Sequence, residues 1–196
     1  MRKSKTLAKI RAGKCARVCG MGHYLPFFIR YAAHFRYDVI WLDLEHRAMD
    51  QREVQSILAM CQQHDIDCMV RSPTLERTGL YRYLEDGATG VMIPFVSNAD
   101  IARDIVEAVG SDHLRLIMDA VNHFGSIQDV YHSSAFLNCI FDAVGPLAPV
   151  AHLKDVKVSP GLVVHIDQEV PGEGELDLAL MLQRFDALFP DGYGLI

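Results

Sequence analysis

The sequence predicts an α/β fold of the (β/α) barrel type. Short apolar runs that fit buried strands alternate along the chain with longer segments of helical period. The first four of these repeats are compact, at about 25 residues each, as expected for strand–helix–strand units with short connections. Polar side chains follow most of the apolar runs, at the positions where a barrel of this type carries its site.

Each predicted strand is a short apolar run between two segments of helical period. These runs cover residues 15–20, 38–43, 67–71, 90–94, 114–119, 149–154 and 192–196. A closed barrel of this type has eight strands and usually about 250 residues. Seven strands in 196 residues therefore predict a TIM-barrel-like fold that is incomplete or rearranged.

Helices are predicted between the strands from their period and from residues that start or stop helices. Asp50 and Asn98 are N-cap candidates, Ser72-Pro73-Thr74 introduces another helix, and Gly87 and Gly110 are stop signals. Gly145-Pro146 closes the helix before the strand at 149. The predicted helices cover about 4–12, 24–35, 50–64, 76–86, 98–109, 128–143 and 175–188.

The second half holds one extra apolar run. Leu162–Ile166 lies between a Ser159-Pro160-Gly161 turn and a Pro171–Gly174 loop, and we interpret it as an excursion over the barrel mouth. No linker-like or low-complexity stretch divides the chain. We therefore expect a single barrel-like domain over 1–196, with halves at 1–105 and 106–196.

Composition restricts the class of partner. The net charge of −6 argues against nucleic acid, whose binding depends on clustered Lys and Arg. No apolar run approaches the roughly 20 residues of a membrane helix, and the N-terminus lacks a signal-peptide core, so we expect a cytoplasmic protein without a membrane partner. Seven strands leave two open sheet edges, which favours a homo-oligomer.

The five cysteines are odd in number and form no CxxC pair, which predicts neither a disulfide framework nor a zinc knuckle. Cys15 and Cys19 lie four residues apart, a spacing that could also serve metal binding on a helix. Their apolar and Gly-rich surroundings favour a strand and ordinary burial instead.

The second apolar run ends in Asp43, Glu45 and His46. The two carboxylates share one face of an extended segment, and a carboxylate beside His46 could orient its imidazole for proton transfer. A His46 that hydrogen-bonds the following turn is an equally weighted alternative.

Arg71 follows the third run, where its guanidinium could bind an anionic substrate through two parallel hydrogen bonds. The alternative is a structural ion pair with Glu45 or Glu85.

Three ordered motifs carry a family resemblance: YDVIWLDLEH at 37–46, MVRSP at 69–73 and DGATGVMIPFV at 86–96. Through them, residues from about 6 to 107 resemble the HpcH/HpaI aldolase/citrate lyase family, the metal-dependent pyruvate aldolases. The resemblance implies that His46 moves a proton, that Asp43 orients it, and that Arg71 holds the substrate carbonyl oxygen and steadies a pyruvate enolate. The Glu and Asp that bind the metal in that family have no recognisable counterpart.

From about residue 102 to 196 the chain instead resembles the xylose isomerase-like barrels of the sugar phosphate isomerase/epimerase group, through IMDAVN at 117–122, VAHLKD at 150–155 and HIDQEVPGEGELD at 165–177. This resemblance implies that Asp119 and His152 bind a divalent metal such as Mg, Mn or Zn. Lys154 and Asp155 would then contact the substrate, or else form a solvated loop pair.

The two resemblances together indicate a half-barrel chimera. The first functional hypothesis is a divalent-metal-dependent carbon–carbon lyase that releases or uses pyruvate and acts on 2-oxo acids. The second is a metal-dependent sugar or sugar-phosphate isomerase or epimerase. The third is a catalytically incomplete chimera whose two half-sites never complete one another.

Overall fold

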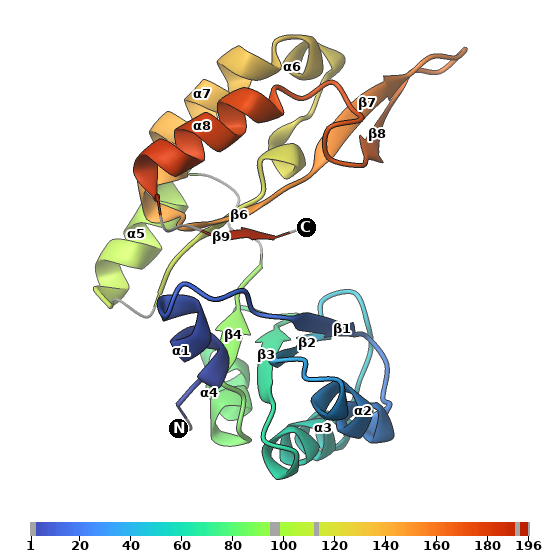
Figure 1. Ribbon diagram of the computed structural model, residues 1–196, viewed down its shortest axis with the longest axis vertical. Helices are drawn as coiled ribbons and strands as arrows, with labels where there is room; N and C mark the ends of the chain where they lie inside the picture. Colours follow the sequence, from blue (N-terminus) through green and yellow to red (C-terminus); the bar gives the residue numbers. More distant parts are fainter. Residues whose placement is uncertain (1–2, 95–98, 112–113, 191–192, 196) are drawn as a thin grey trace. The chain divides into compact units, whose positions relative to one another are not determined.

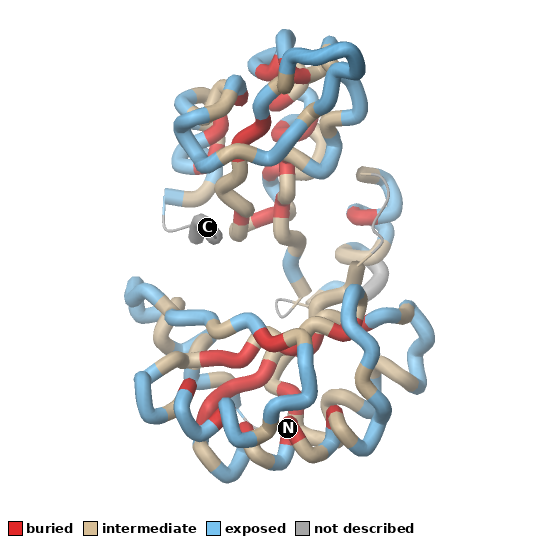
Figure 2. The backbone as a smooth tube through the Cα atoms, turned by 90° about the vertical axis from the view of Figure 1, so that its right-hand side faces the viewer, coloured by how far each residue is buried: buried red, intermediate tan, exposed pale blue. Residues whose placement is uncertain are grey.

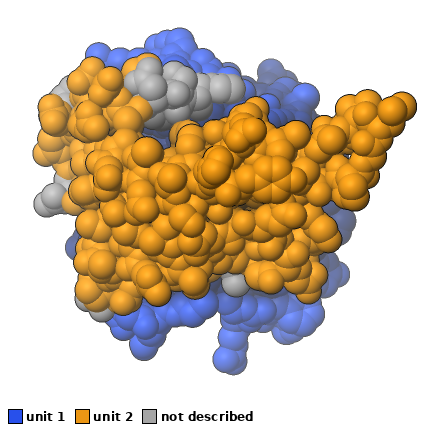
Figure 3. All heavy atoms as spheres, turned by 90° about the horizontal axis from the view of Figure 1, so that it is seen from above, with its two compact units in different colours: residues 1–95 blue, residues 96–196 orange. Residues whose placement is uncertain are grey.

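The computed structural model describes residues 3–94, 99–111, 114–190 and 193–195. The chain divides into two compact units, residues 1–95 and 96–196, which Figure 3 shows in two colours. This division lies at residues 95–96, whereas the sequence placed the junction of its two halves at 105–106. Each unit is described by itself below.

Unit 1 is built on a parallel sheet of four strands in the order β1-β2-β3-β4 (Figure 1). Helices follow the strands in turn, so the unit has the alternating pattern that the sequence predicts. Its strands are β1 (Val18–Met21), β2 (Val39–Asp43), β3 (Asp67–Arg71) and β4 (Gly90–Met92), and its helices are α1 (Lys5–Arg11), α2 (Pro26–His34), α3 (Gln51–Gln63) and α4 (Arg77–Glu85).

The core of unit 1 forms where helices cover the central strands. Ile40 and Leu42 of β2 and Val70 of β3 are fully buried, and Ile57 and Leu58 of α3 pack into the same cluster. Figure 2 shows the buried residues of this unit concentrated along its strands. The side chains at the C-terminal ends of β2 and β3 therefore extend from strands that are fixed in place by this core.

Asp67, at the start of β3, is buried and ties the first helix to the sheet. Its carboxylate accepts hydrogen bonds from the Ser4 hydroxyl at 2.7 Å and from the Thr6 backbone N–H at 2.8 Å. These bonds satisfy a carboxylate that would be costly to bury alone.

Unit 2 holds a second parallel sheet, of strands β5 (Ile117–Met118), β6 (Val150–His152) and β9 (Tyr193–Leu195), in the order β5-β6-β9. A separate antiparallel hairpin is formed by β7 (Asp155–Ser159) and β8 (His165–Glu169) (Figure 1). The helices are α5 (Ala99–Val109), α6 (Ile127–Tyr131), α7 (Ser133–Val144) and α8 (Leu178–Leu188), with short 3-10 helices η1 (Ala120–His123) and η2 (Gly145–Leu147).

The structure has the mixed α/β class that the sequence predicts, and each of the predicted strands overlaps an observed one. Asp50 caps α3 through a capping box with Glu53, and the backbone at Gly87 and Gly110 is left-handed, as expected for stop residues. Asn98, the other predicted N-cap, lies outside the described residues.

Two details of the prediction were wrong. The helix predicted over 128–143 is two helices, because His132 between them leaves helical geometry at φ −110° and ψ 33°. Cys15, expected to be buried, is exposed.

Two other predicted segments can be described more closely. The 72–74 stretch precedes α4, and Glu76 caps the helix by accepting the N–H groups of Thr78 and Gly79. The extra apolar run covers the turn of the β7–β8 hairpin and the first residues of β8.

Among the described residues, each helix is too short or too polar to span a membrane.

Candidate active site

Asp43 and Arg71 are cross-strand neighbours at the C-terminal ends of β2 and β3. Arg71 Nε lies 3.0 Å from Asp43 Oδ1, and Arg71 Nη2 lies 2.7 Å from Asp43 Oδ2, which is the two-point geometry of a strong Arg–carboxylate pair. The remaining nitrogen, Nη1, is 3.0 Å from Oε2 of Glu45. We call these three side chains the β2–β3 cluster.

The hydrogen bonds between Asp43 and Arg71 favour the charged forms of both side chains. The hydrogen bonds from Arg71 hold the pKa of Asp43 below its usual range, although burial opposes them. The same bonds raise the pKa of Arg71. The Arg71 guanidinium also lies 5.5 Å from the centre of the Trp41 ring, a cation–π distance. The guanidinium is thereby held in one orientation at the C-terminal end of β3.

His46 lies beside the cluster with 64% of its side chain exposed. Its Nε2 is 3.6 Å from Glu45 Oε2, while Asp43 Oδ1 accepts the backbone N–H groups of Glu45 and His46 at 3.0 and 3.3 Å. Asp43 thus fixes the turn after β2, and Glu45 is the carboxylate near the imidazole. Glu45 was not among the predicted catalytic residues, although its alternation with Asp43 places both on one face of the strand.

The structure thus brings Asp43, His46 and Arg71 together at the C-terminal ends of the two central strands of the unit 1 sheet. The Arg71–Glu45 ion pair, left open as an alternative from the sequence, is present. The contacts with Asp43 and Glu45 use three of the five N–H donors of the guanidinium, and 22% of the Arg71 side chain is exposed.

The second predicted cluster is formed in unit 2 around Asp119, which follows β5. His152 Nδ1, at the end of β6, lies 2.9 Å from Asp119 Oδ2, and Lys154 Nζ lies 2.6 Å from the same oxygen. Asn122 Nδ2 donates to that oxygen as well, at 3.0 Å. We call these residues the Asp119 cluster. Burial raises the pKa of Asp119, but the hydrogen bonds from His152 and Lys154 outweigh it, and the net direction is downward.

Neither cluster fits a divalent metal in this arrangement. In the Asp119 cluster, the Lys154 ammonium already neutralises the oxygen that His152 contacts. In the β2–β3 cluster, both carboxylates face the guanidinium. Within the part of the chain that the structure describes, no group of three or more His, Cys, Asp or Glu side chains could hold a metal ion.

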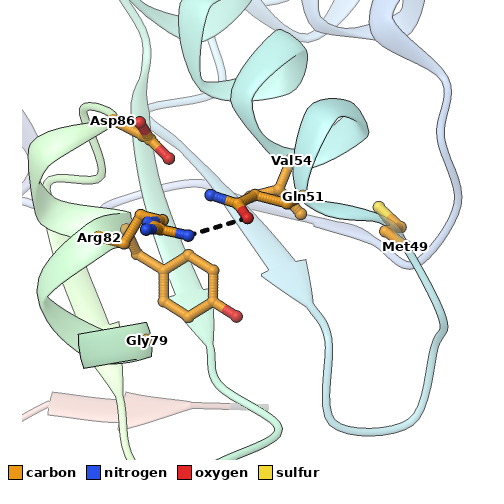
Figure 4. A pocket seen from close by; sticks show the side chains of 7 residues that line it. Met49, Gln51, Val54, Gly79, Arg82 and Asp86 are labelled. Carbon is orange, nitrogen blue, oxygen red and sulfur yellow. Dashed lines mark hydrogen bonds between the residues drawn. The ribbon is translucent and has the colours of Figure 1, made fainter. Parts of the chain in front are cut away.

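A small hollow lies between α3 and α4 (Figure 4). Its volume is about 160 Å³, below the range of typical ligand sites. Arg82 Nη1 donates to Gln51 Oε1 across it at 3.0 Å. None of the predicted site residues lines the hollow, and its lining consists of Met49, Gln51, Val54, Gly79, Arg82, Tyr83 and Asp86.

Comparison with curated proteins finds two aldolases. The chain is 27% identical over 149 residues to a hydroxypyruvate/pyruvate aldolase of Roseovarius nubinhibens, covering 74% of this chain and 58% of that protein. It is 28% identical over 145 residues to a 2-dehydro-3,6-dideoxy-6-sulfogluconate aldolase of Pseudomonas putida, covering 71% and 55%. The match therefore spans little more than half the length of either relative.

Among solved structures, an HpcH/HpaI aldolase from Desulfitobacterium hafniense DCB-2 superposes with a TM-score of 0.51 and 20% identity, over 74% of this chain and 64% of that one. This likeness concerns the fold alone. A xylose isomerase-like TIM barrel/4-hydroxyphenylpyruvate dioxygenase fusion protein reaches a TM-score of only 0.41 at 14% identity, and we draw nothing from it.

A family model matches one continuous stretch of the chain. The HpcH/HpaI aldolase/citrate lyase model aligns with residues 24–117. That range contains Asp43, His46 and Arg71, to which the sequence gave the lyase roles, whereas Lys154, the other predicted substrate contact, lies outside it. The comparisons thus relate residues 24–117, with Asp43, His46 and Arg71 among them, to the HpcH/HpaI aldolase/citrate lyase family.

Proposed function

We propose that this chain belongs to the HpcH/HpaI aldolase/citrate lyase family and takes part in a carbon–carbon lyase reaction on 2-oxo acids, with pyruvate as product or donor. One observation carries the proposal: the family match includes Asp43, His46 and Arg71, which the fold holds together at the ends of β2 and β3. Both curated relatives named above are aldolases, which supports the same reaction class.

In the proposed reaction, Arg71 supplies positive charge beside the oxygen of the oxo acid. Charge develops on that oxygen when the carbon–carbon bond breaks, and a fixed cation there lowers the barrier. The two bonds from Asp43 and the Trp41 ring hold the guanidinium in place before substrate arrives. Asp43 thereby acts on substrate binding through Arg71.

His46 is the proposed acid and base. Its exposed imidazole is accessible to a substrate, and Glu45 Oε2 lies 3.6 Å from Nε2 of the ring. A carboxylate at that position could orient the imidazole for proton transfer. The family resemblance also implies a divalent metal, and among the described residues no group of three or more His, Cys, Asp or Glu side chains could hold one. We assign the proton transfer to His46 and a contact with the substrate oxygen to Arg71. The remaining features that we propose are a small-molecule oxo-acid substrate and a cytoplasmic location.

A coupled assay tests the proposal. The full chain, with Mg or Mn added, is incubated with a 4-hydroxy-2-oxo acid, and released pyruvate is measured through NADH oxidation by lactate dehydrogenase. We expect His46→Ala to lower turnover by about a hundredfold, the usual contribution of a general acid or base.

His64→Ala is the matched control, because His64 also lies in unit 1 but at the end of α3, away from the β2–β3 cluster. We expect it to keep full turnover. Pyruvate release that is equal in the wild type and His46→Ala would remove His46 from the mechanism. A wild type that cleaves no 2-oxo acid under any metal would overturn the lyase proposal.

A second candidate is the metal-dependent sugar isomerase that the sequence suggested from Asp119 and His152. The 2.9 Å contact between His152 Nδ1 and Asp119 Oδ2 favours the isomerase function, whereas the contact of Lys154 with the same carboxylate opposes metal binding. Aldose–ketose interconversion that is lost in His152→Ala would support it. A chain that shows neither activity would be the catalytically incomplete chimera.

A further inference from the structure

Helix α2 exposes a large aromatic surface. Tyr24, Leu25, Phe27, Phe28, Tyr31 and Phe35 form this α2 face, and their exposed fractions range from 38% to 62%. The opposite side of the helix, with Ile29 and Ala32, is already buried in the core of unit 1. A surface helix normally presents polar residues to water, so an apolar outer face marks an interaction site.

A second exposed apolar surface lies at the turn of the β7–β8 hairpin. Leu162 is 105% exposed, Val163 64% and Val164 45%. Figure 1 shows this hairpin extending from the rest of unit 2, with the turn at its far end. We call these three residues the hairpin tip. These apolar side chains lie at the end of the hairpin, outside the core of their own unit. They are therefore available to pack against another surface.

The two surfaces carry opposite charge. Residues 18–37, which contain the α2 face, include the exposed Arg30 and Arg36 and no acidic residue. The stretch from the hairpin turn through β8 to residue 176 carries Asp167, Glu169, Glu173 and Glu175 and no Lys or Arg. β7 contributes one exposed lysine, Lys157, which pairs with Asp167 across the hairpin, so acidic residues remain in excess. Attraction between these charges would steer the tip toward the aromatic face.

We propose that the hairpin tip of one chain docks on the α2 face of a second copy of the same chain. Because every chain carries both surfaces, one copy can supply the tip and a second copy the α2 face. The inference is independent of the proposed function, because it uses neither the β2–β3 cluster nor the Asp119 cluster.

Analytical ultracentrifugation over a wide range of concentration tests the docking. Val163→Asp places a charge on the tip, and Tyr31→Asp places one on the α2 face. Each variant should weaken self-association at least tenfold. The matched controls are Tyr81→Asp on α4 and Tyr131→Asp on α6, which remove tyrosines that are 60% and 65% exposed outside both surfaces. They should associate like the wild type, and circular dichroism confirms folding of every variant.

A mixing experiment separates this contact from other pairings. The Val163→Asp chain keeps an intact α2 face, and the Tyr31→Asp chain keeps an intact tip, so the mixture should form a mixed dimer although neither variant associates alone. Raised salt should weaken it. A monomeric wild type at every concentration overturns the proposal. Val163→Asp that associates like the wild type also overturns it, because two α2 faces would then pair with each other. A mixture of the two variants that stays monomeric overturns it as well.

Discussion

The Asp155 carboxylate lies in the space that a side chain at Gly174 would occupy. A Cβ atom at Gly174 would be 2.3 Å from Asp155 Oδ1 and 2.5 Å from the Val156 carbonyl oxygen. The close approach arises because Asp155, which is 1% exposed, accepts the backbone N–H groups of Gly172, Gly174 and Leu176 at 2.9 to 3.0 Å. The segment after β8 is thus wrapped around one buried carboxylate, and Asp155 is part of the framework of the hairpin.

Gly174→Ala should therefore destabilise the protein. The added methyl would force the carboxylate and the segment apart, at a cost of about 1–3 kcal/mol for an overpacked site. Urea denaturation followed by circular dichroism measures the free energy of unfolding. Gly125→Ala is the control, because a Cβ at Gly125 meets nothing within 4 Å. If both variants unfold alike, Asp155 does not hold this segment closely.

Asp43 should give the protein a stability that acid removes. Hydrogen bonds from Arg71 lower the folded pKa of Asp43, so its contribution is fully present above the unfolded pKa of about 3.9 and is lost as the pH falls through the lower, folded pKa. We expect the free energy of unfolding of Asp43→Asn to fall less steeply below about pH 4 than that of the wild type. Urea melts at a series of pH values measure this, with the exposed Asp104→Asn as control. If the free energy of unfolding falls equally steeply below about pH 4 in the wild type and in Asp43→Asn, the ion pair does not contribute to stability as proposed.

The parallel strands could be predicted because runs such as 38–43 and 67–71 are short and hold an unbroken apolar stretch between one charged residue at each end. The β7–β8 hairpin could not, because most of its residues are polar or exposed and its apolar run covers the turn and the first residues of β8. Hairpin pairing of β7 with β8 leaves no periodic apolar signal in such a segment.

Strand ends pointed to Asp43 and Arg71, which pair in unit 1, and to Asp119 and His152, which pair in unit 2. The partner of each charge was not predictable, since several acidic and basic residues follow each strand and the fold selects among them. Lys154 shows this: as a residue two positions after His152, it could have faced solvent, but it lies 2.6 Å from Asp119. Its contact depends on the pairing of β5 with β6, which sequence spacing alone does not specify.

Arg71→Lys should impair substrate binding far more than a conservative exchange normally does. A lysine keeps the charge but cannot reproduce the two parallel bonds to Asp43 together with the third contact to Glu45. In the pyruvate assay we expect KM for the oxo acid to rise at least tenfold. Arg82→Lys is the control, since Arg82 lies on α4 and donates to Gln51 outside the cluster. An unchanged KM in Arg71→Lys would make Arg71 a structural residue only.

The last prediction concerns competition between Lys154 and a metal ion for Asp119. Because the ammonium lies 2.6 Å from Asp119 Oδ2, its charge repels Mn²⁺ or Mg²⁺ at this carboxylate, and binding to chelator-stripped wild type should be weak by calorimetry. Lys154→Met removes the charge and keeps the length of the side chain. Its affinity for Mn²⁺ should rise at least about tenfold, since unit charges about 4 Å apart already repel by about 1 kcal/mol in water and the metal carries two.

Two further variants decide the interpretation. Lys157→Met removes an exposed lysine on β7 and should leave the affinity unchanged, whereas Asp119→Asn should abolish the binding that Lys154→Met exposes. Tight stoichiometric binding that survives Asp119→Asn would mean that the metal ligands lie elsewhere in the protein. In that case the contact between Asp119 and His152 would be structural, because removing the charge of a carboxylate ligand should weaken the binding of a divalent cation strongly.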